Sequence, residues 1–271
     1  MSDREVTPGD VEWNRPTVFY NGYAKALTYA ILLGFLLWSV LSMDISLERI
    51  IVGIESAQQF LSGFVQPSAD ARRIGFLWEG LVETIHMALI ATVLGVLISL
   101  PVAFTAAENI SPRPVYRASR GLITTVRAFH SLILAIIFVK AFGFGPLAGV
   151  LTLSVKTIGF IGKLLGEDIE DIDMGQVEAA RSTGASIGQI ILFSIVPQVM
   201  PRFIGLTLYR FDINLRSSTI IGIVGAGGVG LLILRAFEQY EYGFLSVILL
   251  SIIGIVFVVE LISGYIRGRI Q

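Results

Sequence analysis

Residues 178–197 read EAARSTGASIGQIILFSIVP and separate two long apolar runs of the chain. The small side chains of Ala179 and Ala180 allow a helix surface to sink into a groove on another protein. Gly184 can adopt the left-handed conformation that ends a helix, and Pro197 suits the first turn of the apolar run that follows. The segment therefore predicts two short helices at an angle, presented outside the membrane as a lever for a partner protein.

The composition predicts a helical membrane protein. Of the 271 residues, 54% are apolar and only 15% are charged, whereas soluble domains have about 25% charged residues. Each membrane-spanning helix needs about 20 apolar residues, so about six spans fit. The chain has no cysteine and no closely spaced histidine pair, which argues against a disulfide, a catalytic thiol or a metal centre. A net charge of −1 without a basic stripe gives no support to a nucleic-acid partner.

Apolar runs and turn residues divide the chain into three parts. Residues 1–25 form a polar tail, and residues 26–80 combine a first span with an amphipathic segment on the far side of the membrane. Residues 81–271 form the core, in which residues 167–197 make the loop that contains the lever. Further spans are expected over residues 81–107 (bent or broken near Pro101), 122–142, 147–165, 197–215 and 244–266. Cations in the short loops place both termini and this loop in the cytoplasm.

A polar stretch, residues 209–218, lies where lipid-facing apolar residues are expected. A charge at the bilayer centre costs about 2.5–3.5 kcal/mol, so these side chains should face a wet cavity or the interior of the bundle. Asp212 and Arg216 are four residues apart and can pair along one helix face. The stretch is either an anion path or gate led by Arg216, or a self-neutralised pair that holds helices together. The candidate path residues are Arg210, Asp212, Asn214, Arg216, Ser217 and, from the fourth span, Lys156.

The sequence Gly225-Ala226-Gly227-Gly228-Val229-Gly230 has the spacing of a dinucleotide-binding loop. It lacks the context of that loop, because no soluble βαβ unit surrounds it. A break between half-helices is the better interpretation, since irregular backbone is tolerated in a membrane where it lines protein or water. The predicted hinge residues are Gly222, Gly225, Gly227, Gly228 and Gly230. The sequence contains no Walker A pattern, so ATP would have to be hydrolysed by another chain.

The spacing Glu-Ala-Ala, three residues, Gly, twelve residues and Pro resembles the signature loop of ABC importer permeases. The matching positions are Glu178, Ala179, Ala180, Gly184 and Pro197. Residues 210–218, running into 221–228, look like the phosphonate-type permeases, and the likeness covers residues 81–271. Such permeases tend to have His where this chain has Lys156. The resemblance implies an all-α, type I ABC importer permease fold with cytoplasmic coupling helices.

The resemblance also implies a function. The chain would be the membrane-spanning permease subunit of an ATP-driven importer of phosphorus oxyanions, namely phosphonate, phosphate or phosphite. It would span a bacterial cell membrane as a homodimer, with two ATPase subunits and an extracytoplasmic binding protein as partners. The ATPases would hold ATP and Mg²⁺, so this chain would bind no cofactor and catalyse no reaction.

Two other functions remain open on the sequence. A permease of a related methionine or metal importer would share the loop at residues 178–197 but should lack the polar run at residues 210–218. An ATP-independent anion channel or secondary transporter would leave that loop unexplained. A membrane-embedded enzyme has little support, because the sequence shows no nucleophile–base or metal constellation.

Overall fold

A computed structural model describes residues 21–43 and 46–270. These residues form helices joined by short turns and contain no β-strand, which confirms the all-α class. The chain forms two compact units, residues 1–59 and residues 60–271. The predicted polar tail, residues 1–25, lies mostly outside the described residues.

The first unit holds α1 (Gly22–Ser42) and most of α2 (Leu47–Val65). α1 begins after Asn21, whose side-chain oxygen accepts a hydrogen bond from Ala24 N at 2.9 Å. None of the α1 residues is buried, and its length and apolar composition suit a membrane span. The predicted first span and the helix after it are both present, while the location of α2 at a membrane surface stays a prediction.

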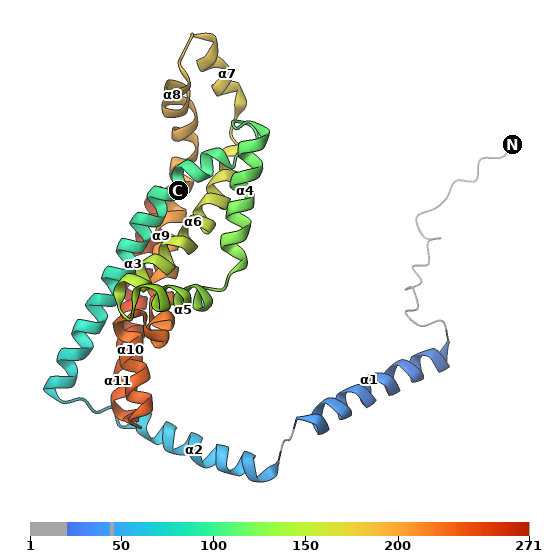
Figure 1. Ribbon diagram of the computed structural model, residues 1–271, viewed down its shortest axis with the longest axis vertical. Coiled ribbons are helices and arrows are strands. Elements are labelled where there is room, and N and C mark those ends of the chain that lie inside the picture. Colours follow the sequence, from blue (N-terminus) through green and yellow to red (C-terminus); the bar gives the residue numbers. More distant parts are fainter. Residues whose placement is uncertain (1–20, 44–45, 271) are drawn as a thin grey trace, which may run out of the picture. The chain divides into compact units, whose positions relative to one another are not determined.

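The second unit is a bundle built around α3 and α6. Its elements after α2 are α3 (Ala71–Thr105), α4 (Arg113–Ala128), α5 (Ser131–Phe142), α6 (Pro146–Glu170), α7 (Met174–Ser182), α8 (Ile187–Ile190), the π-helical turn η1 (Ile191–Ile195), α9 (Val196–Ile221), the π-helical turn η2 (Gly222–Ala226), α10 (Gly228–Glu238) and α11 (Tyr242–Ile270) (Figure 1).

Glycines allow α3 and α6 to pack closely along each other. A Cβ on Gly95 would lie 2.4 Å from Thr157 Cβ, and one on Gly149 would lie 2.8 Å from Met87 Sδ. Lipid tails are as apolar as the helices, so helix association in a membrane depends on such small-residue contacts and on hydrogen bonds between helices. Both α3 and α6 also contact α9, and these three helices make the centre of the bundle.

Five helical runs in the described part of the chain are long and apolar enough to cross a membrane. They are Gly22–Ser42, Ala71–Thr105, Pro146–Glu170, Ile187–Ala226 and Tyr242–Arg269. The pair α4 and α5 passes the same test when its two helices are taken together, and these two helices meet at 90°. The chain is therefore a multi-pass membrane protein with five or six spans, as predicted.

The predicted span over residues 122–142 is not one continuous helix, because the chain breaks between α4 and α5. α4 ends just before Phe129, which is extended (φ −76°, ψ 133°). α5 begins after His130, whose Nδ1 accepts a hydrogen bond from Leu132 N at 3.3 Å. Lys156 Nζ donates to the Phe129 carbonyl at 2.8 Å, so a residue distant in sequence supports the break. α5 has 12 residues, about 18 Å of helix, which is too short for a hydrocarbon core of about 30 Å.

Two prolines lie inside helical runs. Pro101 was expected to bend or break a span, and Pro197 was expected to start one. α3 continues as a helix through Pro101, so the chain does not break there. The run predicted to start at Pro197 begins at Ile187 instead, and the second short helix is continuous with the span. Val196 N donates to Ile191 O, five residues back, which is the pattern of a π-bulge. This wider turn accommodates Pro197, which has no N–H to donate.

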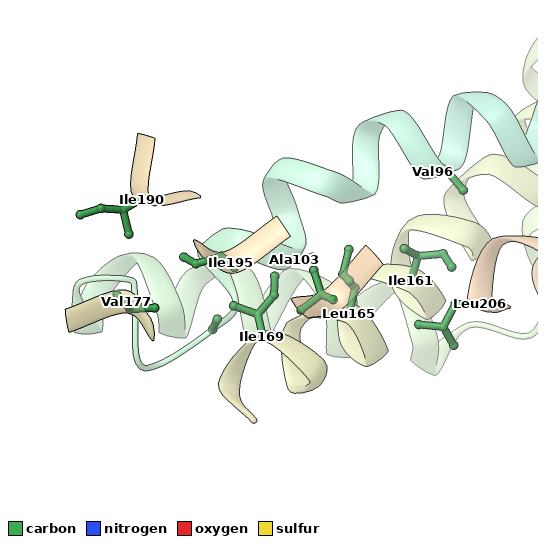
Figure 2. Close-up of a cluster of buried hydrophobic side chains, with 11 residues drawn as sticks. Val96, Ala103, Ile161, Leu165, Ile169, Val177, Ile190, Ile195 and Leu206 are labelled. Carbon is green, nitrogen blue, oxygen red and sulfur yellow. The ribbon is translucent and has the colours of Figure 1, made fainter. Parts of the chain in front are cut away.

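A hydrophobic cluster joins the end of the bundle to α7 and α8 (Figure 2). The residues labelled there are Val96 and Ala103 from α3, Ile161, Leu165 and Ile169 from α6, Val177 from α7, Ile190 from α8, Ile195 from η1 and Leu206 from α9. Figure 1 shows α7 and α8 at one end of this unit, and α11 runs from the opposite end toward them.

Candidate functional site

The α7–α8 segment turns sharply at Gly184. Asp173 starts α7, because its Oδ1 accepts a hydrogen bond from Gly175 N at 2.9 Å. Gly184 has a φ of +80°, the predicted left-handed conformation, which glycine adopts without strain. Ser186 and Gln189 then form a capping box that starts α8. Local sequence signals thus account for both helix starts and for the turn between them.

Two of the predicted coupling residues, Glu178 and Ala179, lie on the outer side of α7, while Gly184 follows this helix and Pro197 lies in the first turn of α9. Glu178 and Ala179 are exposed, whereas Val177 is 3% exposed and packs into the cluster of Figure 2. Ala180 lies at the edge of that cluster, and Ile190 is buried in it. The segment therefore has an inner apolar face attached to α3, α6 and α9 and an outer face of exposed residues. A force on the outer face would reach the bundle through packed side chains.

A charged network holds the base of this segment. Arg120 donates to Glu170 at 2.8 Å and to the Ala106 carbonyl at 2.9 Å, and its guanidinium lies 3.5 Å from Glu167. These contacts fix the end of α6 to α4 and to the end of α3. These contacts were not predicted from the sequence, although the arginines at residues 113–120 and the acidic residues at 167–173 were a signal for them.

The polar stretch of α9 is divided between two faces of the helix. On the face toward α3 and α6, Asn214 is fully buried, and its Nδ2 donates to Thr92 Oγ1 at 2.9 Å and to Thr157 Oγ1 at 3.0 Å. Arg210 is 6% exposed, and its Nε donates to Thr157 Oγ1 at 3.0 Å. The Arg210 guanidinium also lies over the Phe160 ring, 5.3 Å from the centroid. Arg210 and Asn214 thus tie α9 to α3 and α6.

On the other face of α9, Arg216 binds Asp212, as their four-residue spacing predicts. The Asp212 side chain is 10% exposed, while that of Arg216 is 46% exposed. Within the residues that the structure describes, Asp212 Oδ1 has no hydrogen-bond partner. A guanidinium has five N–H donors, so the pair leaves Arg216 with donors on the open side of the helix. An anion can reach this cation without first breaking the pair.

The candidate path residues do not form one site. Arg210 and Asn214 are separated from the Asp212–Arg216 pair by the body of α9, and Ser217 is partly buried. Lys156 lies on α6, where its ammonium binds the carbonyl at the α4–α5 break. A cation at the carboxyl end of a helix is electrostatically favourable. Lys156 therefore has a structural partner, and its role in a path stays a prediction.

The glycine-rich segment is a break between helical pieces, as predicted. Three of the five predicted hinge residues have left-handed φ values, namely Gly225 (+97°), Gly227 (+84°) and Gly228 (+68°). The other two allow close packing: a Cβ on Gly230 would lie 2.1 Å from the Thr219 carbonyl oxygen and 2.7 Å from Gly222 Cα. The start of α10 therefore packs against the end of α9, and motion at this break stays a prediction.

Comparison with known proteins identifies relatives of this chain. The sequence matches the family described as binding-protein-dependent transport system inner membrane component over residues 95–271. It is 41% identical over 207 residues to the phosphate-import permease protein PhnE of Mycolicibacterium smegmatis, a match that covers 76% of this chain and 39% of that protein. It is 42% identical over 192 residues to the phosphite transport system permease protein PtxC of Stutzerimonas stutzeri, covering 70% of each. The chain thus spans about two fifths of the length of the first relative.

The fold is similar to that of a solved transporter. A chain of the inward-facing MetNI methionine ABC transporter matches with a TM-score of 0.67 at 21% identity, covering 75% of this chain and 100% of that chain. This likeness concerns the fold, and it confirms the architecture implied by the loop at residues 178–197. The chain therefore belongs to the binding-protein-dependent transport system inner membrane component family and has the fold of a type I ABC importer permease.

Proposed function

We propose that this chain is the membrane-spanning permease subunit of an ATP-driven importer of phosphorus oxyanions. The family is named for binding-protein-dependent transport. Two relatives, 41% and 42% identical, are named for phosphate import and phosphite transport. The polar run at residues 210–218, which resembles phosphonate-type permeases, supports phosphonate as a third member of the same chemical class.

The observation that best supports the proposal is that the loop at residues 178–197 has one exposed face and one face packed against the bundle. Glu178 and Ala179 are exposed at one end of the bundle, while Val177 and Ile190 are buried in a cluster shared with α3, α6 and α9. An exposed face fixed to the apolar core suits the docking of a soluble subunit that drives motion. An ATPase bound to this face would shift α6 and α9 through that cluster.

The importer would contain two copies of this chain, two ATPase subunits and an extracytoplasmic binding protein. Both termini and the α7–α8 end would face the cytoplasm of a bacterial cell. Arginines near that end support the orientation, because short cytoplasmic segments of membrane proteins are enriched in cations. They are Arg113, Arg117 and Arg120 on α4 and Arg267 and Arg269 on α11.

The substrate would pass along α9, where Arg216 is accessible. A guanidinium suits an oxyanion because it keeps its charge and offers paired N–H groups that match two oxygens. The permease would guide the anion without making or breaking a bond. ATP and Mg²⁺ would be held by the ATPase subunits, and this chain would bind no cofactor.

ATP-dependent uptake of radiolabelled phosphate tests the proposal. Vesicles would contain this chain, its ATPase and its binding protein, with excess methylphosphonate as competitor. ATP-dependent uptake that the competitor abolishes would support an importer with a phosphonate-type preference, and uptake that ignores it would support a phosphate preference. Absence of ATP-dependent uptake of phosphate, phosphite and methylphosphonate would contradict the proposal.

The same vesicles separate the two alternative functions. An anion channel or secondary transporter would still move phosphate after the ATPase is omitted. A methionine or metal importer would take up its own substrate with ATP and leave all three oxyanions outside.

A further inference from the structure

Three residues form a line along one side of α9, next to the face that carries Arg210 and Asn214. Arg202, Tyr209 and Arg216 are spaced by seven residues, so they share one face and follow one another at about 10 Å. All three are accessible, with 60% of the Arg202 side chain, 44% of Tyr209 and 46% of the Arg216 side chain exposed. Two accessible cations on a membrane-spanning helix are unfavourable toward lipid, so this face requires polar surroundings.

A cavity of about 260 Å³ lies on this line between Arg202 and Tyr209. Its lining comes from three helices and consists of Phe160 and Leu164 of α6, Arg202, Gly205, Leu206 and Tyr209 of α9, and Arg267 of α11. Arg267 is close to the end of α11, and α11 runs toward the end of the bundle that holds α7 and α8 (Figure 1). The cavity therefore lies toward the proposed cytoplasmic end, and Arg216 lies deeper along the same face.

The charge of this cavity is positive. Among the described residues that line it are two arginines and no carboxylate. Asp168, which lies outside the lining, forms an ion pair with Arg202, with its Oδ1 3.5 Å from Arg202 Nε, so Arg267 is the arginine of the lining that has no ion pair within the described residues. Arg267 uses its Nε to reach the Ser263 carbonyl at 3.3 Å, and that bond does not involve its two terminal nitrogens.

The shape of the cavity is fixed by its aromatic wall. The Tyr209 ring packs against Phe160 with the ring centroids 5.9 Å apart, which orients a phenol that can donate a hydrogen bond. The space beside Gly205, which is part of the lining, is unfilled, because a Cβ built there would meet nothing within 4 Å. The cavity thus combines two guanidinium groups, one hydroxyl donor and unfilled space.

We propose that this cavity is a binding site for a phosphate-type oxyanion, held by Arg202 and Arg267 with the Tyr209 hydroxyl as a further donor. Guanidinium groups bind such anions through paired charge-assisted hydrogen bonds. The role of the site rests on the proposed function: in an oxyanion importer, it is the last position on the path beyond Arg216 before release. An anionic phospholipid headgroup carries the same phosphate chemistry, and the test separates the two sources.

The site is tested by asking whether bound phosphate protects its arginines from modification by phenylglyoxal, a reagent for arginine side chains. The full chain is purified into nanodiscs of neutral phosphatidylcholine, without ATPase or binding protein, and modification at each arginine is followed by peptide mass spectrometry. Inorganic phosphate is compared with chloride at equal ionic strength. We expect phosphate at about twice its Kd to slow modification of Arg202 and Arg267 about threefold. Arg269, which stacks on Tyr265 at 4.8 Å outside the cavity, should react at an unchanged rate.

Lipid composition distinguishes the source of the anion. Protection by free phosphate in neutral nanodiscs assigns the site to a soluble oxyanion. Protection that appears only in phosphatidylglycerol nanodiscs, without free phosphate, assigns it to a lipid headgroup and removes it from the transport path. Reaction of Arg202 and Arg267 at unchanged rates in both preparations would overturn the site.

Gly205 provides a steric variant with a matched control. Gly205→Ala should fold and retain protection, whereas Gly205→Leu should fill the cavity and abolish it. Because protection is measured without the ATPase, its outcome is independent of the transport assay. Protection without any ATP-dependent oxyanion uptake would reject the proposed function and keep the site, and uptake without protection would reject the site alone.

Discussion

Asn214 and Arg216 are two residues apart on α9, yet their surroundings differ completely. Asn214 is fully buried and bonded to Thr92 and Thr157, while Arg216 keeps nearly half of its side chain accessible. Two helical residues turn the side chain by about 200°, which sends them to opposite sides of α9. Their substitution should therefore affect different properties, one stability and the other transport.

Asn214→Ala should lower the thermal stability of the purified chain. It removes the amide that donates to Thr92 and Thr157, and hydrogen bonds between membrane helices contribute about 0.6–1.7 kcal/mol. Ser217→Ala, at a partly buried position on the same helix, is the control and should leave the unfolding midpoint nearly unchanged. A wild-type midpoint for Asn214→Ala would show that the buried amide does not hold these helices together.

Arg216→Ala should reduce ATP-dependent phosphate uptake about tenfold, the effect of losing ~1.4 kcal/mol of anion binding. The change also leaves the buried Asp212 without its cation, so Asp212→Asn combined with Arg216→Ala separates loss of the cation from damage to packing. Both variants should assemble and transport poorly. Wild-type uptake in either variant would show that Arg216 has only a structural role, as the partner of Asp212.

At the scale of elements, the turn between α7 and α8 was predictable because its signals are local. Gly184 was expected to be left-handed from its position alone, and the structure confirms this. The break between α4 and α5 was not predicted, although Arg127 and His130 interrupt the apolar run there. Its position depends on a contact between distant residues, because Lys156 of α6 donates to the carbonyl of Phe129. The helical run from Ile187 that continues through Pro197 was also not predicted, because a π-bulge has no simple sequence signal.

Gly184→Val should uncouple ATP hydrolysis from uptake. A branched side chain in a left-handed conformation costs about 1–2 kcal/mol, so the turn will reorient and carry the outer face of α7 with it. Gly188→Ala is the control, because that helical glycine has open space around it. The measurement is phosphate taken up per ATP hydrolysed, which should fall in Gly184→Val alone. An unchanged ratio would contradict the lever role of this turn.

Gly230→Ala should destabilise the bundle. The added Cβ would lie 2.1 Å from the Thr219 carbonyl oxygen and 2.7 Å from Gly222 Cα, so α10 must move away from α9. Gly254→Ala, on α11 with nothing within 4 Å of the new Cβ, should be tolerated. Thermal unfolding of the two purified variants compares them directly, and equal midpoints would mean that the close approach of α9 and α10 is not required.

At the scale of the whole molecule, the membrane class and the approximate spans followed from composition and hydrophobic length. The pairing of helices did not, because it depends on contacts between distant residues. Gly95 meets Thr157 and Arg120 meets Glu170 only after the bundle has formed. The same limit applies to the candidate path: its residues could be identified in sequence, but their division between two faces of α9 required the structure.

The proposed function requires an ATPase to dock on the outer face of α7. The chain contains no cysteine, so Ala179→Cys carries a single thiol on that face, and Gln239→Cys places one just after α10 as a control. The most direct measurement is the rate of maleimide labelling of each thiol in the detergent-solubilised chain with and without its ATPase. We expect the ATPase to slow labelling at residue 179 and to leave the rate at residue 239 unchanged. Equal rates at residue 179, for protein that shows ATP-dependent uptake once it is reconstituted into vesicles with its ATPase and binding protein, would contradict this docking.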